Sequence, residues 1–160
     1  YRDDRRRQLS DCTCTALQLA NFWQDVRRDI LERDRIYVPS TVLDEHGLTH
    51  ADLVAAARDN PPLTAEQRAG YRAAMQQLVE RTWPLFDQGR QLWPTVDREV
   101  RLSIRLFTMG GESILRMVER LNYNTLEHRP SLNKAGKLRL MAGGLAGHWL
   151  DRRPAKEPAP

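Results

Sequence analysis

Apolar residues recur every three or four positions along most of the chain, the spacing of one face of an α-helix. In the first segment this pattern extends from near Asp4 to about Arg33 and includes Ala16, Trp23 and Ile30. The sequence contains no alternating apolar and polar runs joined by hairpin turns, the pattern typical of a β-sheet. We therefore predict an all-α protein whose first helix covers this whole segment.

Prolines, glycines and capping residues divide the rest of the chain into further helices. The expected helices are 49–58, 64–89, 94–124 and 130–149, and the tail 151–160 is expected to be disordered. Residues 1–150 are expected to belong to one domain, and Pro84 is expected to kink its long helix. Gly110 and Gly111 lie inside a predicted helix, which indicates either a kink or close helix packing, the interpretation we favour, or a widened cavity.

A stripe of polar residues lies beside the apolar face of the first predicted helix. At roughly 100° per residue, Gln18, Asn21, Asp25 and Asp29 fall within about 80° of one another. Burying amides beside paired carboxylates is unfavourable unless something binds them. Magnesium prefers oxygen ligands and often binds one or two carboxylates together with phosphate oxygens. The stripe therefore predicts a site in which Mg²⁺ is held against a diphosphate.

The two aspartates also have a simpler interpretation. Asp25 and Asp29 could form ion pairs with Arg27, Arg28 or Arg33 on a solvated helix face. Ion pairing is the more common outcome for two aspartates at this spacing. The two amides on the same stripe make a binding site about equally plausible, so both interpretations stay open at this point.

The ordered run QLANFWQDVRRD at 18–29, followed by RIYVP at 35–39, resembles the second aspartate-rich motif of the squalene/phytoene synthases. The variant ANFWQD, preceded by CTAL, is most similar to the bacterial hydroxysqualene synthase branch associated with hopanoid pathways. Many relatives carry arginine where this chain has Gln24. The resemblance implies the C-terminal part of an isoprenoid-synthase-type helical bundle around a central cavity.

The resemblance also implies roles for individual residues. The implied magnesium ligands are Asn21, Asp25 and Asp29, the implied substrate-binding residues are Gln18, Arg35 and Arg129, and the implied catalytic residue is Tyr37. An arginine can bind phosphate oxygens through two parallel hydrogen bonds, and a tyrosine hydroxyl can donate to a diphosphate or orient a water molecule. For Arg129 the alternative is an ordinary surface arginine at a helix end.

The similar branch implies a magnesium-dependent conversion of presqualene diphosphate to hydroxysqualene. Head-to-head prenyl transfer of the phytoene or squalene synthase type, starting from farnesyl diphosphate, is one alternative, and a non-catalytic helical protein of the same fold is another. Members of the family carry an earlier aspartate-rich motif, which Asp3, Asp4 and Asp11 do not resemble. We therefore expect a C-terminal portion of a longer enzyme, inactive alone.

Composition agrees with a globular protein that binds anions. The chain has 160 residues, of which 41% are hydrophobic and 29% charged, and its net charge of +4 favours diphosphates or lipid headgroups as partners. No motif typical of nucleic-acid binding accompanies the charge, so nucleic acid is not an expected partner. No segment approaches the roughly 18 apolar residues of a membrane span, which favours a cytoplasmic location.

The segment 134–150 leaves open a contact with the inner face of the cell membrane. Lys134, Lys137 and Arg139 lie near its start and apolar residues follow. A terminal helix that packs inward on the core is the interpretation we favour. Peripheral binding to anionic lipid is the alternative.

Overall fold

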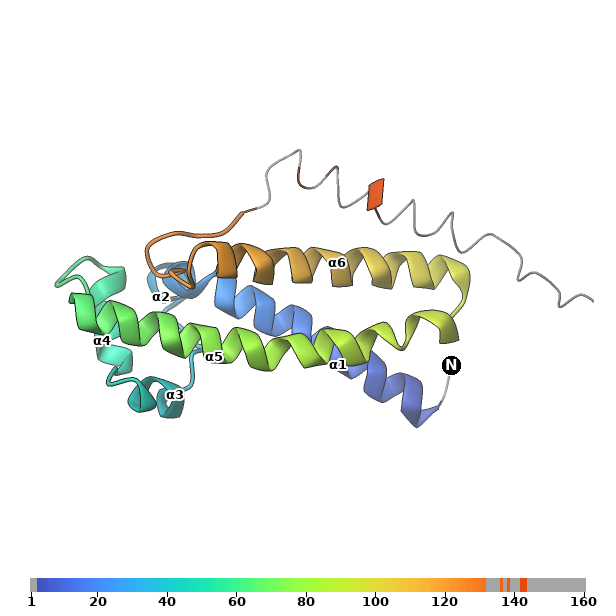
Figure 1. The fold of residues 1–160 in the computed structure, drawn as a ribbon, viewed down its shortest axis with the longest axis horizontal. Coiled ribbons are helices and arrows are strands. Elements are labelled where there is room, and N and C mark those ends of the chain that lie inside the picture. The colour runs from blue at the N-terminus through green and yellow to red at the C-terminus, as the bar shows by residue number, and fades with distance from the viewer. Residues whose placement is uncertain (1–2, 132–135, 137, 139–141, 144–160) are drawn as a thin grey trace, which may run out of the picture.

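Three long helices form the body of the molecule in this computed structural model, which describes residues 3–131, 136, 138 and 142–143. The elements are α1 (Asp4–Gln24), α2 (Val26–Arg33), α3 (Ser40–Glu45), α4 (His50–Ala57), α5 (Ala65–Arg90), the short 3₁₀ helix η1 (Trp93–Thr95) and α6 (Arg98–Arg120). Helices α1, α5 and α6 form the elongated body, and α2, α3 and α4 gather at one end (Figure 1). No strand occurs in the described ranges, which confirms the predicted all-α fold.

The core forms where α1 packs against both α5 and α6. Ala16 and Ala20 of α1 are almost fully buried, and their small side chains let the neighbouring helices approach closely. Tyr71 and Phe86 of α5 and Leu115 of α6 are also completely buried. Removal of these apolar side chains from water is the main stabilising contribution to the bundle.

The two glycines of α6 have different environments. A Cβ atom added to Gly111 would lie 2.7 Å from both Leu17 Cδ2 and Phe86 Cζ, whereas one added to Gly110 would meet nothing within 4 Å. Gly111 therefore allows α6 to pack closely on α1 and α5, which is one of the two possibilities in the favoured interpretation. Gly110 faces open space and has no packing role among the described residues.

The capping patterns predict two helix starts correctly. Thr49 accepts a hydrogen bond from the backbone N–H of Asp52 at 3.2 Å, and Thr64 accepts one from Gln67 at 3.1 Å. In both cases the third residue bonds back to the cap, which completes a capping box. Helix α5 then continues through Pro84.

The predicted single helix from Asp4 to Arg33 is wrong, because α1 ends at Gln24 and α2 begins at Val26. Between them Asp25 has φ −105° and ψ 18°, outside the α-helical values. The Asp25 N–H still donates to the Asn21 carbonyl at 3.0 Å, so the chain bends here rather than separating. The spacing of apolar residues does not reveal such a bend. Asp25 at the bend also makes side-chain contacts, which are described below.

Two further boundaries differ from the prediction. Helix α3 was not expected, and α6 ends at Arg120, because Asn122 and Tyr123 have φ values of 50° and 59° that a right-handed helix cannot contain. The predicted tail 151–160 and most of the predicted helix 130–149, including the cations of its proposed membrane contact, lie outside the described residues. None of the helices described is both long and apolar enough to cross a bilayer.

Candidate functional site

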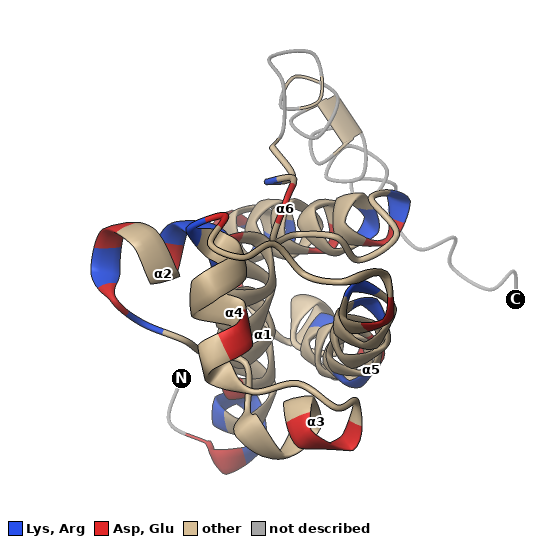
Figure 2. Cartoon of the chain, turned by 90° about the vertical axis from the view of Figure 1, so that its left-hand side faces the viewer, with Lys and Arg blue, Asp and Glu red and all other residues tan. Residues whose placement is uncertain are grey.

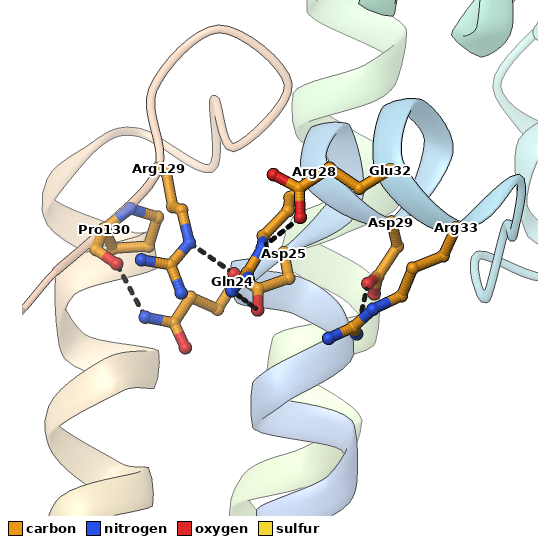
Figure 3. A network of polar contacts seen from close by, with 8 residues as sticks. All are labelled: Gln24, Asp25, Arg28, Asp29, Glu32, Arg33, Arg129 and Pro130. Carbon is orange, nitrogen blue, oxygen red and sulfur yellow. Dashed lines mark hydrogen bonds and ion pairs between the residues drawn. The ribbon is translucent and has the colours of Figure 1, made fainter.

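Asp25 lies at the bend between α1 and α2 and contacts a residue 104 positions later in the sequence. The Arg129 Nε–H donates to Asp25 Oδ1 at 2.5 Å, and the other carboxylate oxygen lies 3.8 Å from an Arg28 guanidinium nitrogen (Figure 3). The Asp25 side chain is only 14% exposed. The structure therefore brings together two of the predicted site residues, Asp25 and Arg129.

Arg129 belongs to residues 121–131, a non-helical segment after α6 that we call the strap. The strap is tied to α1 by the buried Gln24 side chain, whose amide N–H donates to the Pro130 carbonyl at 2.7 Å. It is tied to α5 by a buried hydrogen bond of 2.8 Å between the hydroxyls of Tyr71 and Thr125. These contacts place the end of the strap beside the α1–α2 bend.

Glu127 connects the strap to α5 through a hydrogen bond with Arg68. The Asn124 amide donates to it at 2.7 Å and the Arg68 guanidinium at 2.8 Å, and these hydrogen bonds lower the pKa of Glu127 from its usual value of 4.5. A carboxyl whose pKa is lower in the folded state stabilises the fold above its unfolded pKa. This contribution is lost as the pH falls through the folded value.

We expect the free energy of unfolding to decrease as the pH falls below about 4.5, and Glu127→Gln to weaken this dependence. The measurement is urea unfolding over a series of pH values. Glu99→Gln is the control, because this exposed residue lies at the start of α6, away from the strap. Identical pH profiles for wild type and Glu127→Gln would contradict the expectation.

Asp29 lies on α2 and is 3% exposed, and its carboxylate accepts a hydrogen bond of 2.7 Å from Arg33. The Asp25 and Asp29 carboxylates point toward different arginines (Figure 3). The simpler interpretation, local ion pairing, therefore describes Asp29 with Arg33 and part of the surroundings of Asp25. It does not account for the contact with Arg129, which comes from the far end of the chain.

The remaining predicted residues lie on both sides of the bend. Gln18 and Asn21 are exposed on α1. The Tyr37 ring stacks on Phe22 with the ring centroids 3.7 Å apart and the planes within 7° of parallel. Arg35 donates a hydrogen bond of 3.3 Å to the Tyr37 hydroxyl, which raises the pKa of Arg35. Stacking thus fixes the tyrosine close to the polar stripe.

The surface of this end is rich in charge of both signs. Viewed from the end that carries the short helices, α2 shows positive and negative residues at the periphery (Figure 2). Most of these charges are already paired, as with Arg27 and Asp59 at 2.7 Å and Arg28 and Glu32 at 2.8 Å. A ligand that binds these charges would therefore exchange existing ion pairs for new ones.

The donor chemistry of the polar stripe fits magnesium, although the stripe cannot complete a site. Asn21 and Asp25 offer an exposed amide and a half-buried carboxylate, both hard oxygen donors. Within the described part of the chain, however, no three histidine, cysteine or acidic side chains gather closely enough to hold a metal ion. The stripe could supply part of an octahedral shell, with the rest from water, phosphate oxygens and other carboxylates.

Sequence reasoning missed the structural role of Gln24, which it noted only as a departure from an arginine. The available signal was its position one helical turn after Ala20, on the buried side of α1. A buried amide requires a hydrogen-bond partner, but periodicity does not indicate where that partner lies.

Comparison with known proteins identifies the family. The family model described as squalene/phytoene synthase matches residues 1–136. The chain belongs to the squalene/phytoene synthase family. This confirms the resemblance carried by the aspartate-rich motif.

Individual family members match most of the chain. It is 27% identical to the hydroxysqualene synthase of Rhodopseudomonas palustris over 158 residues, which are 96% of this chain and 50% of that protein. It is 30% identical to the phytoene synthase of Thermus thermophilus over 143 residues, or 89% of this chain and 46% of that protein. The chain thus spans about half the length of these relatives.

A solved structure of the family has the same fold. The crystal structure of squalene synthase HpnC from Alicyclobacillus acidocaldarius matches with a TM-score of 0.66 and 41% sequence identity. The match covers 77% of this chain and 43% of that one. The matched part of this chain therefore has the fold of part of that protein.

Proposed function

We propose that this chain supplies part of the active site for magnesium-dependent conversion of presqualene diphosphate to hydroxysqualene. The observation that carries the proposal is the contact between Asp25 and Arg129 across 104 residues. A carboxylate suited to a metal and a guanidinium suited to a phosphate thus occupy one site. Similarity to a hydroxysqualene synthase supports this choice of reaction.

Each polar residue at the bend has a proposed role. Asn21, Asp25 and Asp29 would hold magnesium, which when bound stabilises the negative charge of the leaving diphosphate. Arg35 and Arg129 would bind diphosphate oxygens through their planar guanidinium groups. Gln18, exposed on α1 one turn before Asn21, would donate its amide to the same diphosphate.

In the proposed reaction the carbon–oxygen bond to diphosphate breaks, and a water molecule adds to the rearranged carbocation and loses a proton. Presqualene diphosphate and water thus give hydroxysqualene and diphosphate. Because Tyr37 accepts a hydrogen bond from Arg35, its own hydroxyl hydrogen is available to a diphosphate oxygen or to that water. The stacking on Phe22 restricts the directions in which this hydrogen can point.

We also propose that the remaining metal ligands are carboxylates from outside this sequence, so that the chain alone is inactive. Two observations support this. The described residues contain no cluster of three acidic, histidine or cysteine ligands, and the relatives are about twice as long as the chain. The missing carboxylates would face Asn21 and Asp25, the more exposed part of the stripe.

The test is to incubate the complete enzyme with Mg²⁺ and either presqualene diphosphate or farnesyl diphosphate, and to identify the products by mass spectrometry. We expect hydroxysqualene from presqualene diphosphate. Phytoene or squalene formed from farnesyl diphosphate would instead support the alternative of head-to-head transfer, which the similarity to a phytoene synthase favours. No product from either substrate would support a non-catalytic protein of this fold.

A further inference from the structure

We propose that Gln24 is a positioning residue that holds Arg129 against Asp25. The inference rests on the proposed function for its effect on diphosphate binding, whereas the positioning itself concerns only contacts within this chain. It explains why an exposed arginine on a non-helical strap occupies one defined place at the α1–α2 bend.

Two neighbouring contacts join the strap to α1. The buried Gln24 amide donates to the Pro130 carbonyl at 2.7 Å, and the adjacent Asp25 accepts from Arg129 at 2.5 Å (Figure 3). Consecutive residues of one segment therefore bind consecutive residues of the other. The first contact fixes the backbone next to Arg129, and the second directs its side chain.

Arg129 needs such support because its side chain is 45% exposed. An exposed arginine loses rotamer freedom when it forms an ion pair, and surface pairs of this kind often add little stability. The ties to α5 are made at Thr125 and Glu127, four and two residues before Arg129. On the C-terminal side of Arg129, the backbone is held by the hydrogen bond of Gln24 with the Pro130 carbonyl.

A neutral amide suits this position. The Pro130 backbone carbonyl is an acceptor, and the Gln24 amide supplies the N–H donor without a charge. An arginine at position 24 could also donate to this carbonyl, but it would place a second positive charge beside Arg129. With glutamine, the negative charge of Asp25 is left to Arg129 and the more distant Arg28.

The first test observes Arg129 directly. Gln24→Met keeps the unbranched length but removes the donor and leaves the Pro130 carbonyl unpaired. The Arg129 Nε–H resonance is assigned in a ¹⁵N-edited NMR spectrum by its loss in Arg129→Lys. We expect its hydrogen exchange to be about tenfold faster in Gln24→Met than in wild type, as for a contact weakened by about 1.4 kcal/mol.

Thr82→Val is the matched control. Thr82 accepts a buried hydrogen bond of 2.9 Å from the Trp23 indole N–H. This variant therefore also loses a hydrogen bond from the last turn of α1, but one that joins α1 to α5 and not to the strap. We expect a lower melting temperature and unchanged Arg129 exchange. Unchanged Arg129 exchange in Gln24→Met would overturn the proposal.

The second test is a double-mutant cycle on binding of Mg²⁺ and inorganic diphosphate to the complete enzyme, measured by calorimetry. Introduced into wild type, Gln24→Met should weaken diphosphate binding about tenfold. Introduced into the Arg129→Ala variant, it should leave the affinity of that variant unchanged. Additive losses would mean that Gln24 acts independently of Arg129, which would overturn the proposal. If wild type does not bind diphosphate, the proposed function fails, and the NMR experiment still decides whether Gln24 positions Arg129.

Discussion

Asp25→Asn is expected to lower kcat/KM of the complete enzyme by about 100-fold or more, with helical content unchanged. The substitution keeps the shape of the side chain but removes the negative charge that would hold the metal and that attracts Arg129. Mutation of a residue that hydrogen-bonds to a metal ligand typically lowers metal affinity or activity by about 10- to 100-fold. Loss of a ligand itself should therefore lower activity by at least the upper value. Steady-state kinetics over a magnesium titration, with far-UV circular dichroism, measures both quantities.

Asp29→Asn is expected to reduce turnover severely as well, and in addition to lower stability. Asp29 is almost completely buried, so the substitution weakens its charge-assisted hydrogen bond with Arg33. Asp44→Asn is the control, because Asp44 is an exposed carboxylate on α3. Near-normal turnover of both Asp25→Asn and Asp29→Asn at every magnesium concentration would show that the stripe is not a metal site.

The second large effect is on stability. Gly111→Ala is expected to lower the free energy of unfolding by about 1–2 kcal/mol, because its Cβ would lie 2.7 Å from Leu17 Cδ2 and from the fully buried Phe86. Gly110→Ala is expected to raise it by about 0.5–1 kcal/mol, since alanine favours the helix and meets no neighbouring atom. Urea unfolding of the two variants and wild type measures both changes.

These adjacent glycines act as controls for each other. Both substitutions add one methyl group to the same helix, so they share the change in helix propensity. Of the two, only Gly111 is in close contact with side chains of α1 and α5. Equal changes in stability for the two variants would contradict the close packing.

The sequence by itself determined the features that depend on neighbouring residues. Apolar spacing determined the all-α class, and together with prolines and caps it determined the approximate extents of α5 and α6 but not the end of α1. The caps at Thr49 and Thr64 determined two helix starts, because a capping box involves residues only three positions apart. The ordered motif from Gln18 to Asp29 determined the family, since residue identities at fixed spacing need no coordinates.

Only the tertiary structure decided how distant segments meet. In the structure the predicted first helix bends at Asp25, and Gly111 rather than Gly110 is closely packed. The side chain of Arg129 also lies in contact with Asp25. Periodicity and capping act over a few residues, so they carry no information on partners 104 or 106 positions apart, such as Arg129 for Asp25 or Pro130 for Gln24. Those contacts form because α1 packs against both α5 and α6, which places the strap beside the end of α1.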